Sequence, residues 1–223
     1  MHNFKKIFAG AGILITENQQ KNFQRYIDLI LQWNKRTNLI SRKDESKIFE
    51  NHVMESLAFL LSFELSSNAK VIDVGSGAGF PALPISLIRS DINFLLVESK
   101  RMKSLFLKEV ASELKLTNVE VLCARVEDLV QKSEYEGRFD FAFSRAVASL
   151  TVVYGWVKKL IKLNGFYIAW KGGEVRQEIE QLKKNNENID VDIVQMDERF
   201  VHFKKDRLFV RVKQIASNKR GED

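Results

Sequence analysis

The chain has 223 residues, of which 45% are hydrophobic, so we expect one large domain, alone or with an appended module. Its formal net charge of +6 favours an anionic partner such as nucleic acid. Its single cysteine excludes an internal disulfide, its three dispersed histidines offer no metal-ligand spacing, and no apolar run reaches the roughly 18 residues of a membrane span. We therefore expect a cytoplasmic protein that binds neither a metal ion nor a membrane. We also expect a monomer, although no sequence feature addresses the oligomeric state.

The first part of the chain has the pattern of a helical module. Residues 16–19 read Thr-Glu-Asn-Gln, which fits a capping box, and apolar residues then recur at helical spacing from Phe23 to Leu31. A polar break at 34–47 separates this helix from a second helical pattern at 49–61. We assign residues 1–66 to an N-terminal helical extension.

From Lys70 onward, short apolar runs alternate with amphipathic stretches, which is typical of a parallel sheet covered by helices on both faces. The expected strands are 71–74, 94–97, 119–122, 139–143, 165–170, 191–196 and 208–212, the last two close enough for an antiparallel hairpin. The predicted fold class is α/β, with a doubly wound, mostly parallel Rossmann-like sheet and an antiparallel C-terminal strand. This domain is expected to span 67–216, followed by a disordered tail at 217–223.

The most informative segment follows the first expected strand. Residues 71–81 read Val-Ile-Asp-Val-Gly-Ser-Gly-Ala-Gly-Phe-Pro, in which Gly75, Gly77 and Gly79 allow a ligand to approach the backbone closely. A dinucleotide site has the spacing G-x-G-x-x-G, whereas this loop has G-x-G-x-G with Asp73 two residues before the first glycine. This spacing is more typical of S-adenosylmethionine sites, so S-adenosyl-L-methionine is the predicted cofactor.

Three more residues are expected around the same cofactor. Glu98 ends the second strand, where an acid can accept hydrogen bonds from ribose hydroxyls; a helix N-cap or a solvated residue is the alternative. Val126 and Glu127 follow the third strand and are candidates for the adenine side of the site. The alternative is an ordinary helix start, in which Glu127 stabilises the first turn. Both interpretations can hold at once.

Arg145 and Lys171 follow the fourth and fifth expected strands. Arg145 is a candidate for gripping a carboxylate, a phosphate or a guanine edge, although pairing with a surface acid is the alternative. Lys171 ends the next strand and is expected to face the same way. The glycines after it indicate either close approach of a ligand or simply a tight strand-to-helix turn. The fourth strand lacks the Asn/Asp-Pro-Pro-aromatic signature of amine methylation. We interpret Cys123 as a small buried hydrophobe rather than a nucleophile.

These residues together resemble the glucose-inhibited division protein B family, the RsmG-type methyltransferases that act on guanine N7 in small-subunit ribosomal RNA. The similarity includes the segments 38–40, 52–57, 75–81, 125–127, 144–146 and 171–172, together with Glu98. The His-x-x-Glu-Ser-Leu segment at 52–57 and the Ser-Arg-Ala segment at 144–146 are the most selective. Glu55 stands where the family usually has aspartate, and Ala82 where glycine is common.

The resemblance implies that S-adenosyl-L-methionine is bound by Gly75, Phe80, Val126, Glu127 and Arg145, and that the target is a guanosine in the 530 loop of 16S rRNA. The expected partner is 16S rRNA or the small ribosomal subunit. His52 lies in a selective segment and is a candidate for lining the site, although a lone helical histidine is more often structural. Guanine N7 has no proton to remove, so we expect Arg145, with Lys171 nearby, to hold guanine O6 or a phosphate.

Two alternatives share the same cofactor half. One is a methyltransferase for a small molecule, and the other is a non-catalytic RNA-binding scaffold of the same fold. Basic pairs weigh against the first, because they could form an RNA-binding rim, although each pair alone is more often a solvated face. These pairs are Lys35-Arg36, Arg42-Lys43, Lys158-Lys159, Lys183-Lys184 and Lys204-Lys205.

Overall fold

One seven-stranded sheet forms the centre of the molecule. The computed structural model describes residues 4–197 and 206–215, so the expected tail at 217–223 lies outside the described residues. Every expected strand is present, with slightly different bounds. The strands are β1 (Lys70–Val74), β2 (Asn93–Glu98), β3 (Val119–Cys123), β4 (Phe139–Arg145), β5 (Ile161–Gly172), β6 (Ile189–Gln195) and β7 (Arg207–Gln214).

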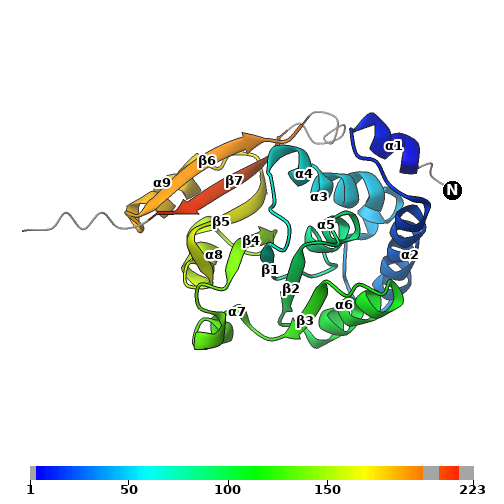
Figure 1. Cartoon of the computed structure of the whole chain (residues 1–223), viewed down its shortest axis with the longest axis horizontal. Helices are drawn as coiled ribbons and strands as arrows, with labels where there is room; N and C mark the ends of the chain where they lie inside the picture. Colours follow the sequence, from blue (N-terminus) through cyan, green and yellow to red (C-terminus); the bar gives the residue numbers. More distant parts are fainter. Residues whose placement is uncertain (1–3, 198–205, 216–223) are drawn as a thin grey trace, which may run out of the picture.

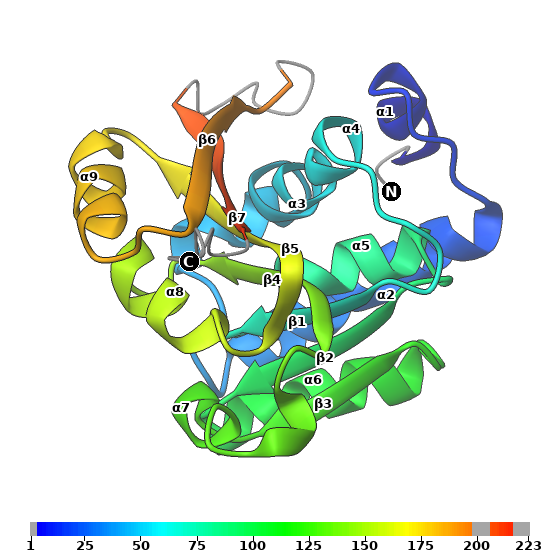
Figure 2. The same cartoon turned by 60° about the vertical axis from the view of Figure 1, so that its left-hand side comes forward.

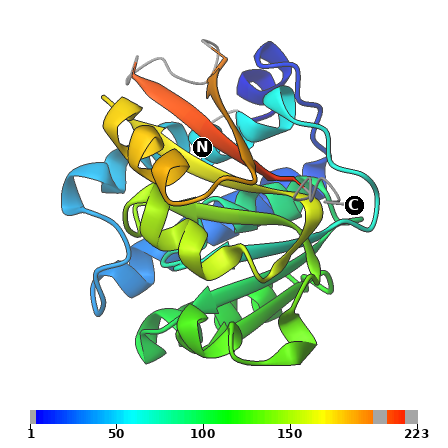
Figure 3. The same cartoon turned by 90° about the vertical axis from the view of Figure 1, so that its left-hand side faces the viewer.

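The strand order is β3-β2-β1-β4-β5-β7-β6. Strands β1 to β5 pair in parallel, whereas β7 is antiparallel to both β5 and β6, which confirms the predicted hairpin and fold class. Figure 3 shows the sheet from the green strands at the bottom to red β7 at the top. The order reverses between β1 and β4, so the carboxyl ends of these two strands flank the crevice in which such sheets bind ligands.

Helices cover both faces of the sheet (Figure 2). Helices α5 (Ala82–Ile88) and α6 (Arg101–Glu113) pack on one face, and α2 (Glu17–Asn34) packs on these two helices. The same hydrophobic core includes residues of α1 (Phe4–Gly10), η2 (Phe49–Met54), α3 (Glu55–Leu57) and α4 (Phe59–Ser62). The other face packs against α7 (Val126–Leu129), η3 (Ser133–Tyr135), α8 (Leu150–Val157) and α9 (Arg176–Lys184). In the described part of the chain, no helix is long and apolar enough to cross a membrane.

Helix α2 begins with the predicted capping box. The Thr16 hydroxyl accepts a hydrogen bond from the Gln19 N–H, and the Gln19 side chain accepts one from the Thr16 N–H. The apolar stripe of α2 belongs to the same hydrophobic core as the sheet, and its residues Phe23 and Ile30 are fully buried. The helical extension therefore shares one continuous core with the sheet. Figure 1 shows its helices lying beside the strands.

The polar break after α2 is an organised turn. The Asn34 side-chain oxygen accepts the N–H groups of Leu39 and Ile40, and its amide donates to Glu45 at 2.7 Å. Residues Arg42–Lys47 then form the 3₁₀ helix η1, and the chain enters η2, which is π-helical. Single π-turns are frequent at functional sites, so η2 is a candidate part of the functional site.

The interpretation of Cys123 as a buried residue is wrong. Cys123 is exposed at the end of β3. Strand β3 lies at the edge of the sheet and pairs only with β2, so its side chains are covered less than those of the central strands.

Candidate functional site

The glycine loop follows β1 and is tied to the end of β2. The N–H groups of Gly75 and Ser76 both donate to the carbonyl of Val97. Gly75, Gly77 and Gly79 have φ values of +69°, +58° and +93°, which side-chain-bearing residues rarely adopt. A Cβ at Gly79 would lie 2.2 Å from Leu83 Cδ1. Glycine is therefore required here both by backbone conformation and by space.

Glu98 holds this loop in place. The Glu98 carboxylate is 6% exposed and accepts the N–H of Gly77 at 2.9 Å through one oxygen and that of Lys100 at 2.7 Å through the other. The Lys100 bond lies just before α6, which begins at Arg101, and is not a side-chain cap of that helix. A carboxylate offers about four lone-pair sites, so Glu98 keeps acceptor capacity for the hydroxyl groups of a ribose.

Asp73 is a buried acid beside the loop. It is 1% exposed, and neither side-chain oxygen has a hydrogen-bond partner among the described residues, since the Ser76 hydroxyl donates to the Asp73 backbone carbonyl. Burial raises the pKa of Asp73 to about 7, although the nearby Ser76 and Arg145 lower it. Unpaired buried carboxylates are unfavourable, so this one is suited to receive a cationic group.

A cavity of about 170 Å³ lies on the expected adenine side. Its lining includes Gly75, Val97, Val126, Glu127 and Val147. Val126 is buried, and Glu127 is exposed at the start of α7. The cavity is smaller than the 300 Å³ or more of a typical ligand pocket, so it suits one ring system of a larger ligand. The structure thus gathers the predicted cofactor residues around the ends of β1, β2 and β3.

Arg145 lies at the end of β4, next to the glycine loop. Its Nη2 donates to His52 Nδ1 at 2.7 Å, and its guanidinium lies 5.0 Å from the centre of the Phe80 ring. The His52 ring stacks on the same Phe80 ring at 5.0 Å. The π-helix η2 therefore brings His52 to the guanidinium, although the two residues are 93 positions apart.

Glu55 lies between two arginines. Its carboxylate, 5% exposed, is 3.7 Å from Arg145 Nη1 and 3.4 Å from Arg207 Nε. Burial lowers the pKa of the Arg145 guanidinium, and Glu55 opposes this effect. Among the described residues, Arg145 Nη1 has no hydrogen-bond partner. Two guanidinium groups around one carboxylate, with a donor to spare, suit an anionic or electron-rich ligand.

Lys171 lies on the other face of the sheet. Its Nζ pairs with Glu178 of α9 at 2.9 Å and donates to the Ala148 carbonyl. Trp170 is the register partner of Arg145, and successive residues of a strand point to opposite faces. The expectation that Lys171 faces the same way as Arg145 is therefore wrong, and Lys171 instead joins α9 to the loop after β4.

Tyr26 is part of the site and was hidden in the sequence by its place on the apolar stripe of α2. Its hydroxyl donates to the Ala78 carbonyl of the glycine loop at 2.6 Å, and its ring packs on Phe80 at 5.5 Å. Burial raises the pKa of Tyr26 well above its ordinary value, so the hydroxyl stays protonated. A tyrosine on a buried helix face needs a hydrogen-bond partner for its hydroxyl, and Tyr26 is fully buried. Its place among the apolar residues of the helix could therefore have marked it as a residue that bonds to another element.

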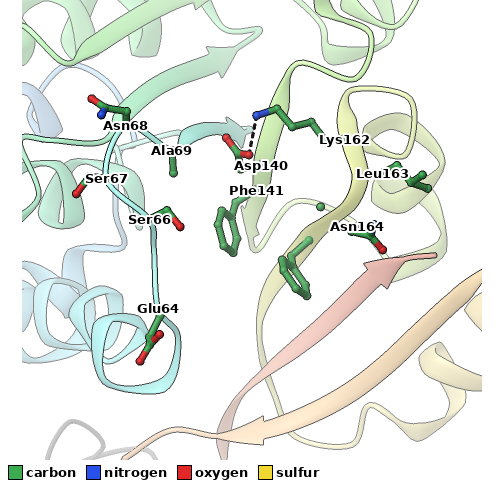
Figure 4. Close-up of a pocket in the computed structure, with 12 residues that line it drawn as sticks. Glu64, Ser66, Ser67, Asn68, Ala69, Asp140, Phe141, Lys162, Leu163 and Asn164 are labelled. Carbon is green, nitrogen blue, oxygen red and sulfur yellow. Dashed lines mark hydrogen bonds and ion pairs between the residues drawn. The ribbon is translucent and has the colours of Figure 1, made fainter. Parts of the chain in front are cut away.

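A larger cavity, of about 440 Å³, lies at the opposite ends of the strands (Figure 4). It opens where β1 and β4 begin, and Asp140 and Lys162 on its wall pair at 2.7 Å. Because it lies at the opposite ends of the strands from the glycine loop, it is not the cofactor site. Residues 4–197 and 206–215 contain no group of three His, Cys, Asp or Glu side chains placed to hold a metal ion.

Comparison with known proteins shows the family of the chain. A family model described as rRNA small subunit methyltransferase G matches residues 19–208. Ribosomal RNA small subunit methyltransferase G of Desulforamulus reducens is 38% identical over 170 residues, which are 76% of this chain and 71% of that protein. The protein of the same name from Clostridium perfringens is 36% identical over 179 residues, covering 80% of this chain and 75% of its own length.

The fold also has solved counterparts. A SAM-dependent methyltransferase from Aquifex aeolicus superposes with a TM-score of 0.58 at 18% sequence identity, covering 78% of this chain and 96% of that one. At this identity the likeness concerns the fold alone. It confirms the predicted Rossmann-like sheet.

Proposed function

Since the chain belongs to the rRNA small subunit methyltransferase G family, we propose that it transfers a methyl group from S-adenosyl-L-methionine to N7 of a guanosine in the 530 loop of 16S rRNA. The observation that carries this proposal is the Arg145 guanidinium, held by His52 at the carboxyl end of β4 beside the glycine loop. We further propose that the protein acts in the cytoplasm as a monomer, on 16S rRNA or on the small subunit.

The residues at the ends of β1 to β3 fit the cofactor. Asp73 would receive its cationic methionine end, Glu98 the ribose hydroxyls, and the cavity at Val126 and Glu127 the adenine ring. When bound, the cofactor supplies an electrophilic methyl group. Gly75 and Gly77 have no side chains, so the cofactor can approach the backbone of the loop closely at these two residues.

The acceptor side needs alignment and no base. Guanine N7 carries a lone pair and no proton, so this lone pair forms the bond to the methyl carbon while the bond from that carbon to sulfur breaks. Arg145, through its spare donor, would hold guanine O6 or an adjacent phosphate in line. His52 Nδ1 is already engaged by Arg145, which agrees with a reaction that uses no general base.

The test is a methyl-transfer assay with Arg145→Ala. Small subunits lacking the modification are incubated with the protein and labelled S-adenosylmethionine, and N7-methylguanosine is mapped in the 16S rRNA. The wild type is expected to label one guanosine of the 530 loop, and the variant to lose at least a hundredfold of that rate while staying folded. Arg25→Ala is the matched control, because Arg25 pairs with Glu113 on the surface.

Two results would contradict the proposal: full turnover by Arg145→Ala, or no N7-methylguanosine from the wild type.

The salt dependence of rRNA binding tests the alternative of a small-molecule methyltransferase. The basic pairs at 35–36, 42–43, 158–159 and 183–184 are exposed, whereas Lys204-Lys205 lies outside the described residues. Phosphate contacts by such groups predict that rRNA affinity falls steeply between 50 and 200 mM salt, by about a factor of ten or more.

A further inference from the structure

An acidic residue of η1, Asp44, adjoins the Arg145 cluster and has no role in the chemistry above. Its Oδ2 lies 3.6 Å from His52 Nε2. The Ser41 hydroxyl donates to Oδ2 at 2.7 Å, and the Asn51 amide donates to Oδ1 at 2.8 Å. The carboxylate is therefore fixed from two sides while it faces the imidazole.

The contact between Arg145 and His52 defines how the imidazole is protonated. An arginine side chain only donates hydrogen bonds, so the His52 Nδ1 that it contacts at 2.7 Å must be an acceptor. His52 is then neutral, with its proton on Nε2, the nitrogen that faces Asp44. A carboxylate beside one ring nitrogen favours the proton on that nitrogen.

We propose that Asp44 is a positioning residue that acts through His52 on Arg145, an inference that rests on the proposed function. The Asp44 charge keeps the proton on Nε2, which leaves Nδ1 free to accept from Arg145. With the proton on Nδ1 instead, the His52 Nδ1–H and the Arg145 Nη2–H would both be donors and could not form a hydrogen bond. The guanidinium would then turn toward Glu55, 3.7 Å away, and lose its alignment with the target base.

The ring itself is held in the required orientation. His52 stacks on Phe80 with an angle of 25° between the ring planes, so its two nitrogens stay directed at Asp44 and Arg145. The Ser56 hydroxyl, in α3, donates to the carbonyl of His52 in the π-helix at 2.6 Å. The π-helix therefore directs one nitrogen of the His52 ring at Asp44 and the other at Arg145.

The experiment combines kinetics with nitrogen NMR of the histidine ring. Asp44→Ala is expected to lower kcat for small-subunit methylation about tenfold, the size of a typical coupling between contacting residues, with cofactor Kd unchanged. Asp44→Asn, which keeps the shape of the side chain and removes its charge, is expected to lower kcat to a similar extent, because the charge favours the proton on Nε2. In a His52→Gln background, Asp44→Ala is expected to cost nothing further.

The ring spectrum supplies the readout that a merely structural role would not move. Wild-type His52 is expected to show the neutral Nε2–H form, with a shift toward the Nδ1–H form in Asp44→Ala. Glu45→Ala is the control, since it removes an acid from the same turn that contacts Asn34 and not His52. An unchanged ring spectrum, or an equal loss of kcat in the His52→Gln background, would overturn the proposal. If the wild type methylates nothing, the proposed function fails, and the spectrum still decides the coupling.

Discussion

Replacing Asp73 by Asn is expected to stabilise the protein and weaken its cofactor binding at the same time. Burial raises the pKa of Asp73 to about 7, from about 4 in an unfolded chain. The folded state therefore binds this proton more tightly, and stability is lost as the pH rises from about 4 to about 7. At about 1.4 kcal/mol for each pKa unit, the ionised carboxylate costs the cofactor-free protein about 4 kcal/mol at pH 8.

The asparagine has the shape of the protonated acid and cannot ionise. The variant without cofactor is expected to be more stable than the wild type by up to about 4 kcal/mol at pH 8, and nearly equal to it at pH 4. Its cofactor Kd is expected to rise about tenfold to a hundredfold, because a charge-assisted hydrogen bond contributes about 1.5 to 3 kcal/mol. Wild-type affinity should fall as the pH drops below 7, and that of the variant should not.

Urea unfolding from pH 4 to 8 and calorimetric titration with S-adenosylmethionine measure the two effects. Asp140→Asn is a control of opposite sign. Burial raises the pKa of Asp140, but the hydrogen bonds from Lys162 and from the Lys70 N–H, together with the Lys162 charge, outweigh burial and lower this pKa. That substitution should destabilise the protein above pH 4. If Asp73→Asn proves less stable than the wild type at pH 8, or if its cofactor affinity keeps the wild-type pH dependence, then Asp73 is not a buried, unpaired acid that receives the cofactor.

Three other predictions concern neighbouring groups. Glu55→Gln is expected to cost about 3 kcal/mol in urea unfolding and to slow methyl transfer, because Arg145 and Arg207 lose the charge between them; equal stability would contradict this. Gly79→Ala is expected to lose about 2 kcal/mol or more in thermal unfolding, from a φ of +93° and a contact with Leu83, and a wild-type melting temperature would refute the steric argument. Tyr26→Phe should cost about 1 kcal/mol and weaken cofactor binding measured by calorimetry, whereas unchanged values would show that its bond to the loop is dispensable.

The sheet could be predicted from the sequence because its central strands are buried on both faces. Such strands are continuous apolar runs, and β1, β2 and β4 are found where those runs lie. The polar break after α2 gave no comparable signal. Asn34 organises that turn through side-chain bonds to Leu39, Ile40 and Glu45, and hydrogen-bonded turns of this kind leave no periodicity in the sequence.

The site was predictable where one short segment carries the chemistry. The glycine spacing and Arg145 at a strand end were both recognised on local grounds. Lys171 was misplaced because a position one residue further along a strand reverses the face, and the apolar pattern of β5 does not fix its exact end. Asp44 and Arg207 could not be found from the sequence. The contact of Asp44 depends on the π-helix that places His52, and Arg207 contacts Glu55, which lies more than a hundred residues earlier in the chain.

Phe80 explains why the cofactor loop and the acceptor cluster form one unit. It ends the glycine loop, packs on Tyr26, which bonds to that loop, and supports both the His52 ring and the Arg145 guanidinium. The same 5%-exposed ring therefore fixes the loop that approaches the cofactor and the cation that orients the base. Methyl transfer without a general base depends on this alignment, so a rigid aromatic group shared by both halves serves the reaction better than separate supports would.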